Sequence, residues 1–299
     1  MAEERYIRFD WAIKRLLRHK ADFVVVEGFL TSLLGEPLKI VEVLESEGNR
    51  QTADDKTNRV DVLVKDTKGR KIIIEIQNYF EDDYFHRMLY GASKVVTEHI
   101  KRGDAYGGIG KVYSVNIVFF KLGQGEDYVY QGKTDFRGIH RHDVLLLTKE
   151  QQRVFEVGPG AGDVFPEYFV LRVEDFDAVA KTPLDEWIHF LKTEEIPSGF
   201  SAPGLAEARE RLQESKLTST ERTAYERHYK DLRIRNSEIE TAFRHGTSFG
   251  EKRGEKRGVK QGLKQAALAM LADGMPSETV AKYTGLPAKA VKALSKNRR

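Results

Sequence analysis

The sequence predicts an α/β fold, a mixed sheet flanked by helices, with a helical C-terminal extension. Three observations lead to this prediction. A strand-helix-strand passage lies between residues 70 and 122, as in mixed sheets. Two Val- and Ile-rich runs are separated by Asp66-Thr67-Lys68-Gly69, a hairpin signal. Beyond residue 205 the chain is charged and helical in composition, with glycine at every fourth position over one stretch.

Two helices are expected first. Residues 10–17 carry apolar side chains near helical spacing, and Asp10 stands where an N-cap would. Residues 23–34 form the second helix, which Gly35 and Pro37 end. Strands are expected at 40–44, 60–65, 70–77, 111–122, 128–130, 144–147 and 169–173. Further helices are expected at 82–100 and 184–192, and a linker at 198–203.

The C-terminal extension begins with a charged helical segment over 206–243. Glycine then recurs every four residues, which predicts a loose basic helix or linker because each glycine weakens a helix. A short apolar helix at 264–271 and two more helices follow. The spacing of Ala281, Gly285 and Val291 resembles a helix-turn-helix core. Both DNA contact and a small packing or oligomerisation module fit this spacing.

Composition and charge restrict the possible functions. The chain has no cysteine, which excludes disulfides, thiolate nucleophiles and cysteine zinc sites. No signal peptide and no membrane-length apolar stretch is visible, so we expect a soluble, cytoplasmic protein without a membrane partner. Residues 246–299 hold 12 Lys and Arg against 4 Asp and Glu. Such a basic tail fits either contact with nucleic acid or a solvated surface.

The segment that indicates chemistry is the predicted hairpin. If the loop is Thr67-Lys68-Gly69 with glycine in the left-handed position, paired residue numbers sum to 136, and Asp61 faces Glu75. Directly opposed side chains share one face, and like charges there are destabilising. A positive group must therefore offset the repulsion. A hard cation such as Mg²⁺, or a Lys or Arg from elsewhere in the fold, would do so.

Strand alternation places Gln77 on the same face as Glu75, beside the predicted metal. Ile74 and Ile76 point to the opposite face, into the core. The Ile76 carbonyl lies between the two polar residues and is a candidate oxygen ligand. A one-residue slip of the hairpin would break this arrangement.

The pattern resembles the PD-(D/E)XK nucleases, in which an acid on one strand and an acid-x-Lys on the next hold a metal. More closely, the chain resembles the Rpn family of recombination-promoting nucleases, also called PD-(D/E)XK nuclease family putative transposases. Segments spread over nearly the whole chain carry this likeness. They are Phe9-Asp10 with Ile13-Lys14, Asn58-Arg59-Val60-Asp61, Ile73-Ile74-Glu75-Ile76-Gln77, Tyr84 to Tyr90, Phe165-Pro166-Glu167-Tyr168, Pro183-Leu184-Asp185-Glu186-Trp187 and the glycine repeat.

The resemblance implies a magnesium-dependent DNA endonuclease, with Mn²⁺ as an alternative ion, linked to recombination or mobile DNA. Asp61 and Glu75 would be ligands, and Gln77 stands where the class has Lys, so it can orient water or substrate but cannot carry charge. Asp10 matches the early acid of the family. Its alternative role is an N-cap, and Glu27 is the competing acid.

Four regions are expected on this basis: a PD-(D/E)XK nuclease domain at 1–195, a charged helical segment at 196–245, the glycine repeat at 246–264, and a small helical tail at 265–299. Two other hypotheses stay open. One is a DNA-binding protein whose nuclease site has degenerated, as Gln77 suggests. The other is an interaction protein that forms a homo-oligomer through its C-terminal helices.

Overall fold

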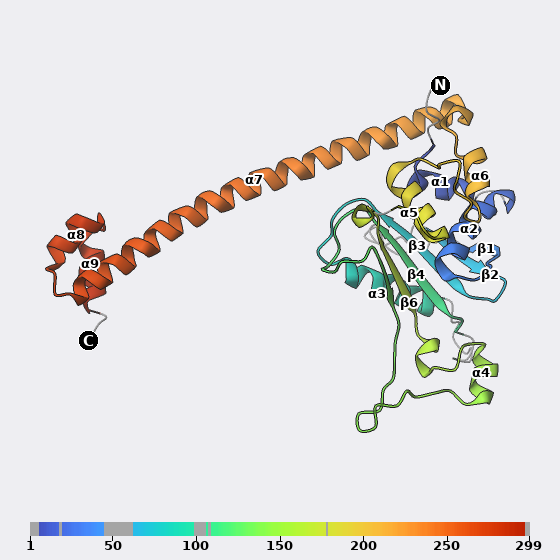
Figure 1. The fold of residues 1–299 in the computed structure, drawn as a ribbon, viewed down its shortest axis with the longest axis horizontal. Helices are drawn as coiled ribbons and strands as arrows, with labels where there is room; N and C mark the ends of the chain where they lie inside the picture. Colours follow the sequence, from blue (N-terminus) through green and yellow to red (C-terminus); the bar gives the residue numbers. More distant parts are fainter. Residues whose placement is uncertain are drawn as a thin grey trace. The chain divides into compact units, whose positions relative to one another are not determined.

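The computed structural model describes residues 6–17, 20–44, 62–98, 106, 109–177 and 179–296. The chain divides into two compact units, Met1–His228 and Tyr229–Arg299. Figure 1 shows the elements of each unit. The four regions expected from composition stay a proposal. None of the helices in the described ranges is long and apolar enough to cross a bilayer.

The first unit is built on a six-stranded mixed sheet in the order β1-β2-β3-β4-β6-β5. Neighbours β3, β4 and β6 run parallel, whereas the other neighbouring pairs are antiparallel. The strands are β1 (Ile40–Leu44), β2 (Val62–Asp66), β3 (Lys71–Gln77), β4 (Val112–Val118), β5 (Val129–Gly132) and β6 (Glu167–Arg172). The predicted α/β fold is confirmed.

The prediction of a strand at residues 144–147 is wrong. Val144 and Leu146 make only isolated bridges, to Arg137 and Gly160. Consecutive Val144, Leu145 and Leu146 are all exposed, so no alternation gives the segment a buried face. The Val and Leu content alone therefore mispredicted it. The 111–122 strand also ends early, at Val118.

The β2–β3 hairpin has the predicted register. The pairs Leu63↔Ile73 and Val62↔Ile74 each sum to 136. Gly69 adopts φ +75°, the left-handed conformation that the three-residue loop requires. The buried carboxylate of Asp66 accepts hydrogen bonds from the backbone N–H of Lys68 (3.0 Å) and Arg70 (2.9 Å), which holds the turn. The register of the strands is thus fixed from the turn outward.

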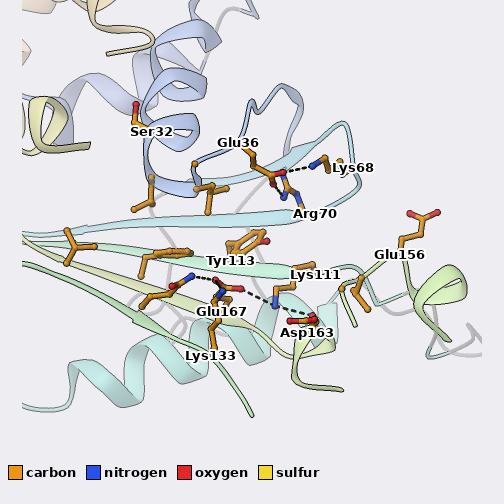
Figure 2. A pocket seen from close by; sticks show the side chains of 18 residues that line it. Ser32, Glu36, Lys68, Arg70, Lys111, Tyr113, Lys133, Glu156, Asp163 and Glu167 are labelled. Atoms are coloured by element: carbon orange, nitrogen blue, oxygen red, sulfur yellow. Dashed lines mark hydrogen bonds and ion pairs between the residues drawn. The ribbon is translucent and has the colours of Figure 1, made fainter. Parts of the chain in front are cut away.

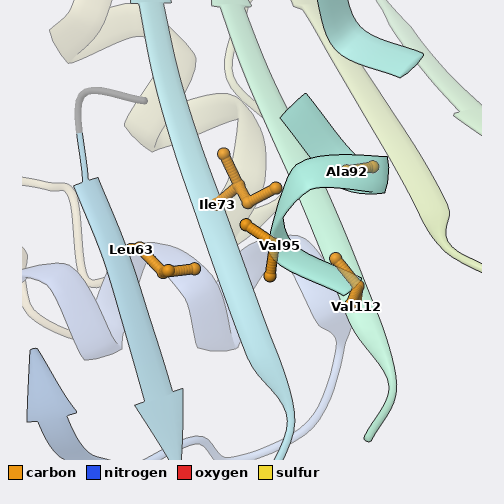
Figure 3. Close-up of a cluster of buried hydrophobic side chains, with 5 residues drawn as sticks. All are labelled: Leu63, Ile73, Ala92, Val95 and Val112. Atoms are coloured by element: carbon orange, nitrogen blue, oxygen red, sulfur yellow. The ribbon is translucent and has the colours of Figure 1, made fainter. Parts of the chain in front are cut away.

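Helix α3 (Tyr84–Glu98) covers one face of the sheet. Ala92 and Val95 of this helix pack against Leu63, Ile73 and Val112, one from each of three adjacent strands (Figure 3). The other face is also buried, since Ile72 and Ile74 are fully buried. Burial on both faces explains the unbroken Ile run in β3.

Helices α1 (Phe9–Leu16), α2 (Phe23–Leu34), α5 (Pro183–Thr193) and α6 (Leu205–Arg211) gather on the other side of the sheet (Figure 1). Trp187 is fully buried among them, edge-on to Phe9 and Phe29. This tryptophan is therefore part of the core.

Residues 198–203 do not act as a linker. The Trp187 indole donates to the Pro203 carbonyl at 3.1 Å. A Cβ on Gly28 would lie 2.2 Å from the same carbonyl oxygen, so only glycine allows this approach of the chain to α2. The segment is therefore packed into the first unit.

Helix α7 (Ser219–Ala272) is one continuous helix of 54 residues that includes the whole glycine repeat. Of the two predicted alternatives, a loose basic helix or a linker, the structure has the helix, although each glycine still costs about 1 kcal/mol relative to alanine. Helices α8 (Ser277–Thr284) and α9 (Ala288–Lys296) fold back on its end. Ala267, Val280 and Val291 form their shared core, and Gly285 ends α8 with φ +66°.

Candidate functional site

Strand β3 brings two of the predicted site residues to one face. Glu75 and Gln77 alternate with the core residues Ile74 and Ile76, on the face that α3 covers. Ile76 is 8% exposed and pairs with Ile117 of β4. The predicted opposition of Asp61 to Glu75 is one step beyond the pair Val62↔Ile74. Asp61 lies outside the described residues, so that opposition stays a prediction.

Glu75 is a buried carboxylate, 7% exposed, at the edge of the core. Its Oε2 lies 3.4 Å from Nη2 of Arg87, on the first turns of α3. Arg87 also holds Glu81, with Nη1 3.1 Å from Oε1. Burial lowers the pKa of Arg87, but the charges of Glu75 and Glu81 outweigh burial and raise it. Arg87 is thus a permanent cation at the position where the sequence required positive charge.

Gln77 belongs to the same network. Its amide donates to Glu81 Oε1 at 2.6 Å, and also to the Tyr79 carbonyl at 3.3 Å. Glu81 therefore accepts hydrogen bonds from both Gln77 and Arg87. Because Arg87 also contacts Glu75, the side chains of Glu81 and Arg87 link Gln77 to Glu75. Gln77 and Glu75 are thus held in position by Glu81 and Arg87, which follow β3 in the chain.

Asn116 adds a buried polar group beside Glu75, its register partner on β4. Its Oδ1 accepts from the Tyr84 hydroxyl (3.3 Å), and its amide donates to Ser114 Oγ (3.0 Å) and the Phe169 carbonyl (3.2 Å). These bonds satisfy the amide inside the core and fix the sheet next to Glu75.

Asp10 lies in a second polar cluster at the end of β3. Its Oδ2 accepts from the Asn78 amide at 3.1 Å, and Arg8 Nε lies 3.2 Å from its Oδ1. Arg8 Nη2 also donates to Asn78 at 2.9 Å. His228, from α7, places Nε2 3.5 Å from Asp10 Oδ2. The first helix is thereby fastened to the residue that follows Gln77.

Burial would raise the pKa of the Asp10 carboxyl. Interactions with His228 and with the charge of Arg8 outweigh burial and lower the pKa to about 2. The group is therefore ionised at neutral pH although its side chain is only 6% exposed. Helix α1 begins at Phe9, so Asp10 is inside the helix and is not its N-cap residue.

The competing acid, Glu27, lies at the opposite end of the sheet, near the hairpin turn. Its buried carboxylate accepts from the Ile40 backbone N–H at 2.9 Å and from Lys39 Nζ at 2.7 Å. Ile40 pairs with Asp66, next to the hairpin turn. Glu27 is thus a structural contact between α2 and β1. The side chain of residue 14 lies outside the described set.

A cavity of about 760 Å³ opens at this hairpin end of the sheet (Figure 2). Six of the charged side chains that line it form ion pairs with each other. Glu36 contacts Lys68 and Arg70, and Glu167 lies 3.4 Å from the Nζ atoms of both Lys111 and Lys133. The cavity is separate from Glu75 and Gln77, which lie at the other end of β3.

The donors around Glu75 have the chemistry that suits a hard cation, since a buried carboxylate and a strand carbonyl are oxygen ligands. Among the described residues, no three His, Asp or Glu side chains converge as a ligand group. Asp61 lies outside the described residues.

Comparison with known families bears on this geometry. Residues 7–154 match the model of the PD-(D/E)XK nuclease family transposases. The matched segment belongs to that family. It includes Asp10, Glu75, Gln77 and Arg87, and it confirms the resemblance inferred from the motifs. No curated protein and no solved structure matches the chain.

Sequence reasoning missed four partners: Glu81, Asn78, Arg8 and His228. Asn78 and Glu81 follow Gln77 within four residues, and polar residues just after a predicted active-site strand were the signal that could have found them. Arg8 precedes the family's early acid by two residues. His228 carries no sequence signal, because it reaches Asp10 from 218 residues away only through tertiary packing.

Proposed function

We propose that this PD-(D/E)XK family chain is a metal-dependent DNA endonuclease acting in recombination or on mobile DNA. The observation that carries the proposal is Glu75. Glu75 is a buried carboxylate on β3 inside the family-matched segment, and the hairpin register predicts that Asp61 pairs with it.

Asp61, Glu75 and the Ile76 carbonyl would hold the ion, Mg²⁺ or Mn²⁺. A bound divalent ion supplies an activated water and offsets charge on the scissile phosphate. The chain's own residues do the positioning. Arg87 holds Glu75 at 3.4 Å, and Gln77 presents an amide that can orient water or a phosphate oxygen. Neither Gln77 nor Arg87 can act as a proton acceptor near neutral pH.

Asp10 would complete the site as the acid of the first helix. Its carboxyl stays ionised because of Arg8 and His228, and Asn78 connects it to the end of β3. Of the two acids that the sequence left open, Asp10 is the better candidate. Glu27 is committed to the Ile40 backbone at the other end of the sheet.

The test is cleavage of supercoiled plasmid by the full chain in Mg²⁺, in Mn²⁺ and in EDTA. We expect nicking only with metal, and its loss in Asp61→Asn and Glu75→Gln variants. Glu36→Gln is the matched control, since it removes a carboxylate at the cavity on the opposite end of the sheet. Circular dichroism verifies that each variant is folded. Nicking that persists in both site variants would refute the proposal.

One observation favours a second candidate, a DNA-binding protein with a degenerate site. Gln77 replaces the class Lys, and its amide is already engaged with Glu81. On this hypothesis wild-type protein binds DNA but leaves it intact in either metal. A filter-binding assay beside the plasmid assay separates the two candidates, because only the endonuclease hypothesis requires cleavage.

A further inference from the structure

Helix α7 carries a mostly apolar stripe just before the glycine repeat. Within the second unit, Tyr229, Leu232, Asn236, Ile239 and Phe243 follow one another at alternating spacings of three and four residues. This is the heptad spacing that keeps one seam of a helix facing a partner helix. We call these five residues the heptad seam.

The heptad seam lies on a part of α7 whose side chains are mostly exposed. No described side chain between residues 226 and 266 is buried, and Ile239 and Phe243 are 43% and 73% exposed. Exposed apolar side chains on one line of a long helix mark a contact surface. In the described part of the second unit, the interior of α7 therefore carries apolar side chains that are exposed or at most half-buried.

We infer that the heptad seam pairs with the same seam of a second copy of this chain, in a parallel two-stranded coiled coil. Two features favour this occupant, namely an asparagine in the core of the seam and the charges beside the seam. Tyr229, Asn236 and Phe243 take the first core position of the heptad, and Leu232 and Ile239 take the second. A single Asn at the first core position is the residue that fixes register and two-stranded pairing in parallel coiled coils. In an antiparallel pair it would face an apolar residue of the partner instead.

Flanking charge agrees with the parallel pairing. Arg235 and Glu240 occupy the two positions that border the seam, five residues apart. In a parallel pair in register, these positions of opposite helices meet, so each Arg235 approaches the Glu240 of the other copy. Two such attractions arise from the symmetry. A second copy is thus complementary in charge at this pair of positions.

The glycine repeat cannot extend this seam as one face. Residues four apart advance by about 40° around a helix, so Gly246 and Gly262 lie about 160° apart. The seam therefore ends where the repeat begins. The seam offers only five core residues from each helix, so we expect a small interface and a reversible monomer–dimer equilibrium.

Sedimentation equilibrium of the full chain between about 1 and 100 μM tests the pairing. We expect a monomer–dimer equilibrium that Ile239→Glu weakens at least about 30-fold, since both helices gain a carboxylate in the seam. Ile234→Glu is the matched control. Ile234 is an isoleucine of similar exposure, 48%, on the same helix but off the seam, and its substitution should change the constant less than about threefold.

Orientation is tested by cross-linking, which the absence of cysteine makes simple. Under mild oxidation, Asn236→Cys should give a disulfide-linked dimer, whereas Ile234→Cys should not. A wild-type chain that stays monomeric at about 100 μM, or equal effects of the two glutamate variants, would overturn the inference. Equal cross-linking of the two cysteine variants would overturn it too. None of these measurements depends on nuclease activity, so the inference and the proposed function fail separately.

Discussion

Neutralising Asp10 tests the electrostatic reasoning behind the site. Asp10→Asn keeps the shape of the side chain but removes the charge that Arg8 and His228 stabilise. The pKa of Asp10 falls from 3.8 to about 2 in the folded chain, and each unit corresponds to about 1.4 kcal/mol. The ionised carboxylate therefore contributes about 2 kcal/mol to the free energy of unfolding at neutral pH.

The sign of the pH dependence follows from the lowered pKa. The contribution is fully present above the unfolded-state pKa near 4 and is lost as pH falls through the folded-state value near 2. About half of it should remain at pH 3. The stability difference between wild type and Asp10→Asn should thus shrink as the solution is acidified.

Urea denaturation in EDTA at pH 7, 5, 4 and 3 measures that difference. Tryptophan fluorescence is the readout, because Trp11 and Trp187 both belong to the first unit. EDTA removes any metal that Asp10 would bind, so only the protein's own charges contribute. A difference that stays constant from pH 7 to pH 3 would refute the assignment of Arg8 and His228 as the stabilising partners.

Three other predictions follow from the contacts. Arg87→Met should enlarge the rise in melting temperature that Mg²⁺ gives in a thermal shift assay, because Arg87 competes with the metal for Glu75; an unchanged rise contradicts this. Gly28→Ala should lower the free energy of unfolding by about 1–3 kcal/mol in urea, because its Cβ meets the Pro203 carbonyl. Gly199→Ala, where a Cβ meets nothing, is the control. Gly258→Ala should raise helicity and stabilise α7 by up to about 1 kcal/mol by circular dichroism, and a loss of helicity would disprove it.

Local patterns were sufficient for the hairpin and for much of the sheet. The three-residue turn ending at Gly69 predicted which residues pair, and the pairs Val62↔Ile74 and Leu63↔Ile73 agree. These features are determined locally, because a strand has a period of two and a short loop fixes the register. The same alternation put Glu75 and Gln77 on one face.

Local patterns gave a wrong prediction where a segment has the composition of a strand but no buried face. The 144–147 run has strand-like residues but no buried face. Its surroundings decided the conformation of this segment, and propensity did not. The heptad seam lies wholly inside the segment that the sequence predicted to be helical, residues 206–243, so its spacing was already readable there.

The sequence by itself determined the hairpin, the face that carries Glu75 and Gln77, and the family of residues 7–154. Tertiary structure alone decided the partners of those residues. Arg87 reaches Glu75 because α3 packs over the sheet, and His228 reaches Asp10 because α7 begins beside α1. Contacts between residues far apart in the chain depend on how whole elements pack, and a local pattern does not encode that packing.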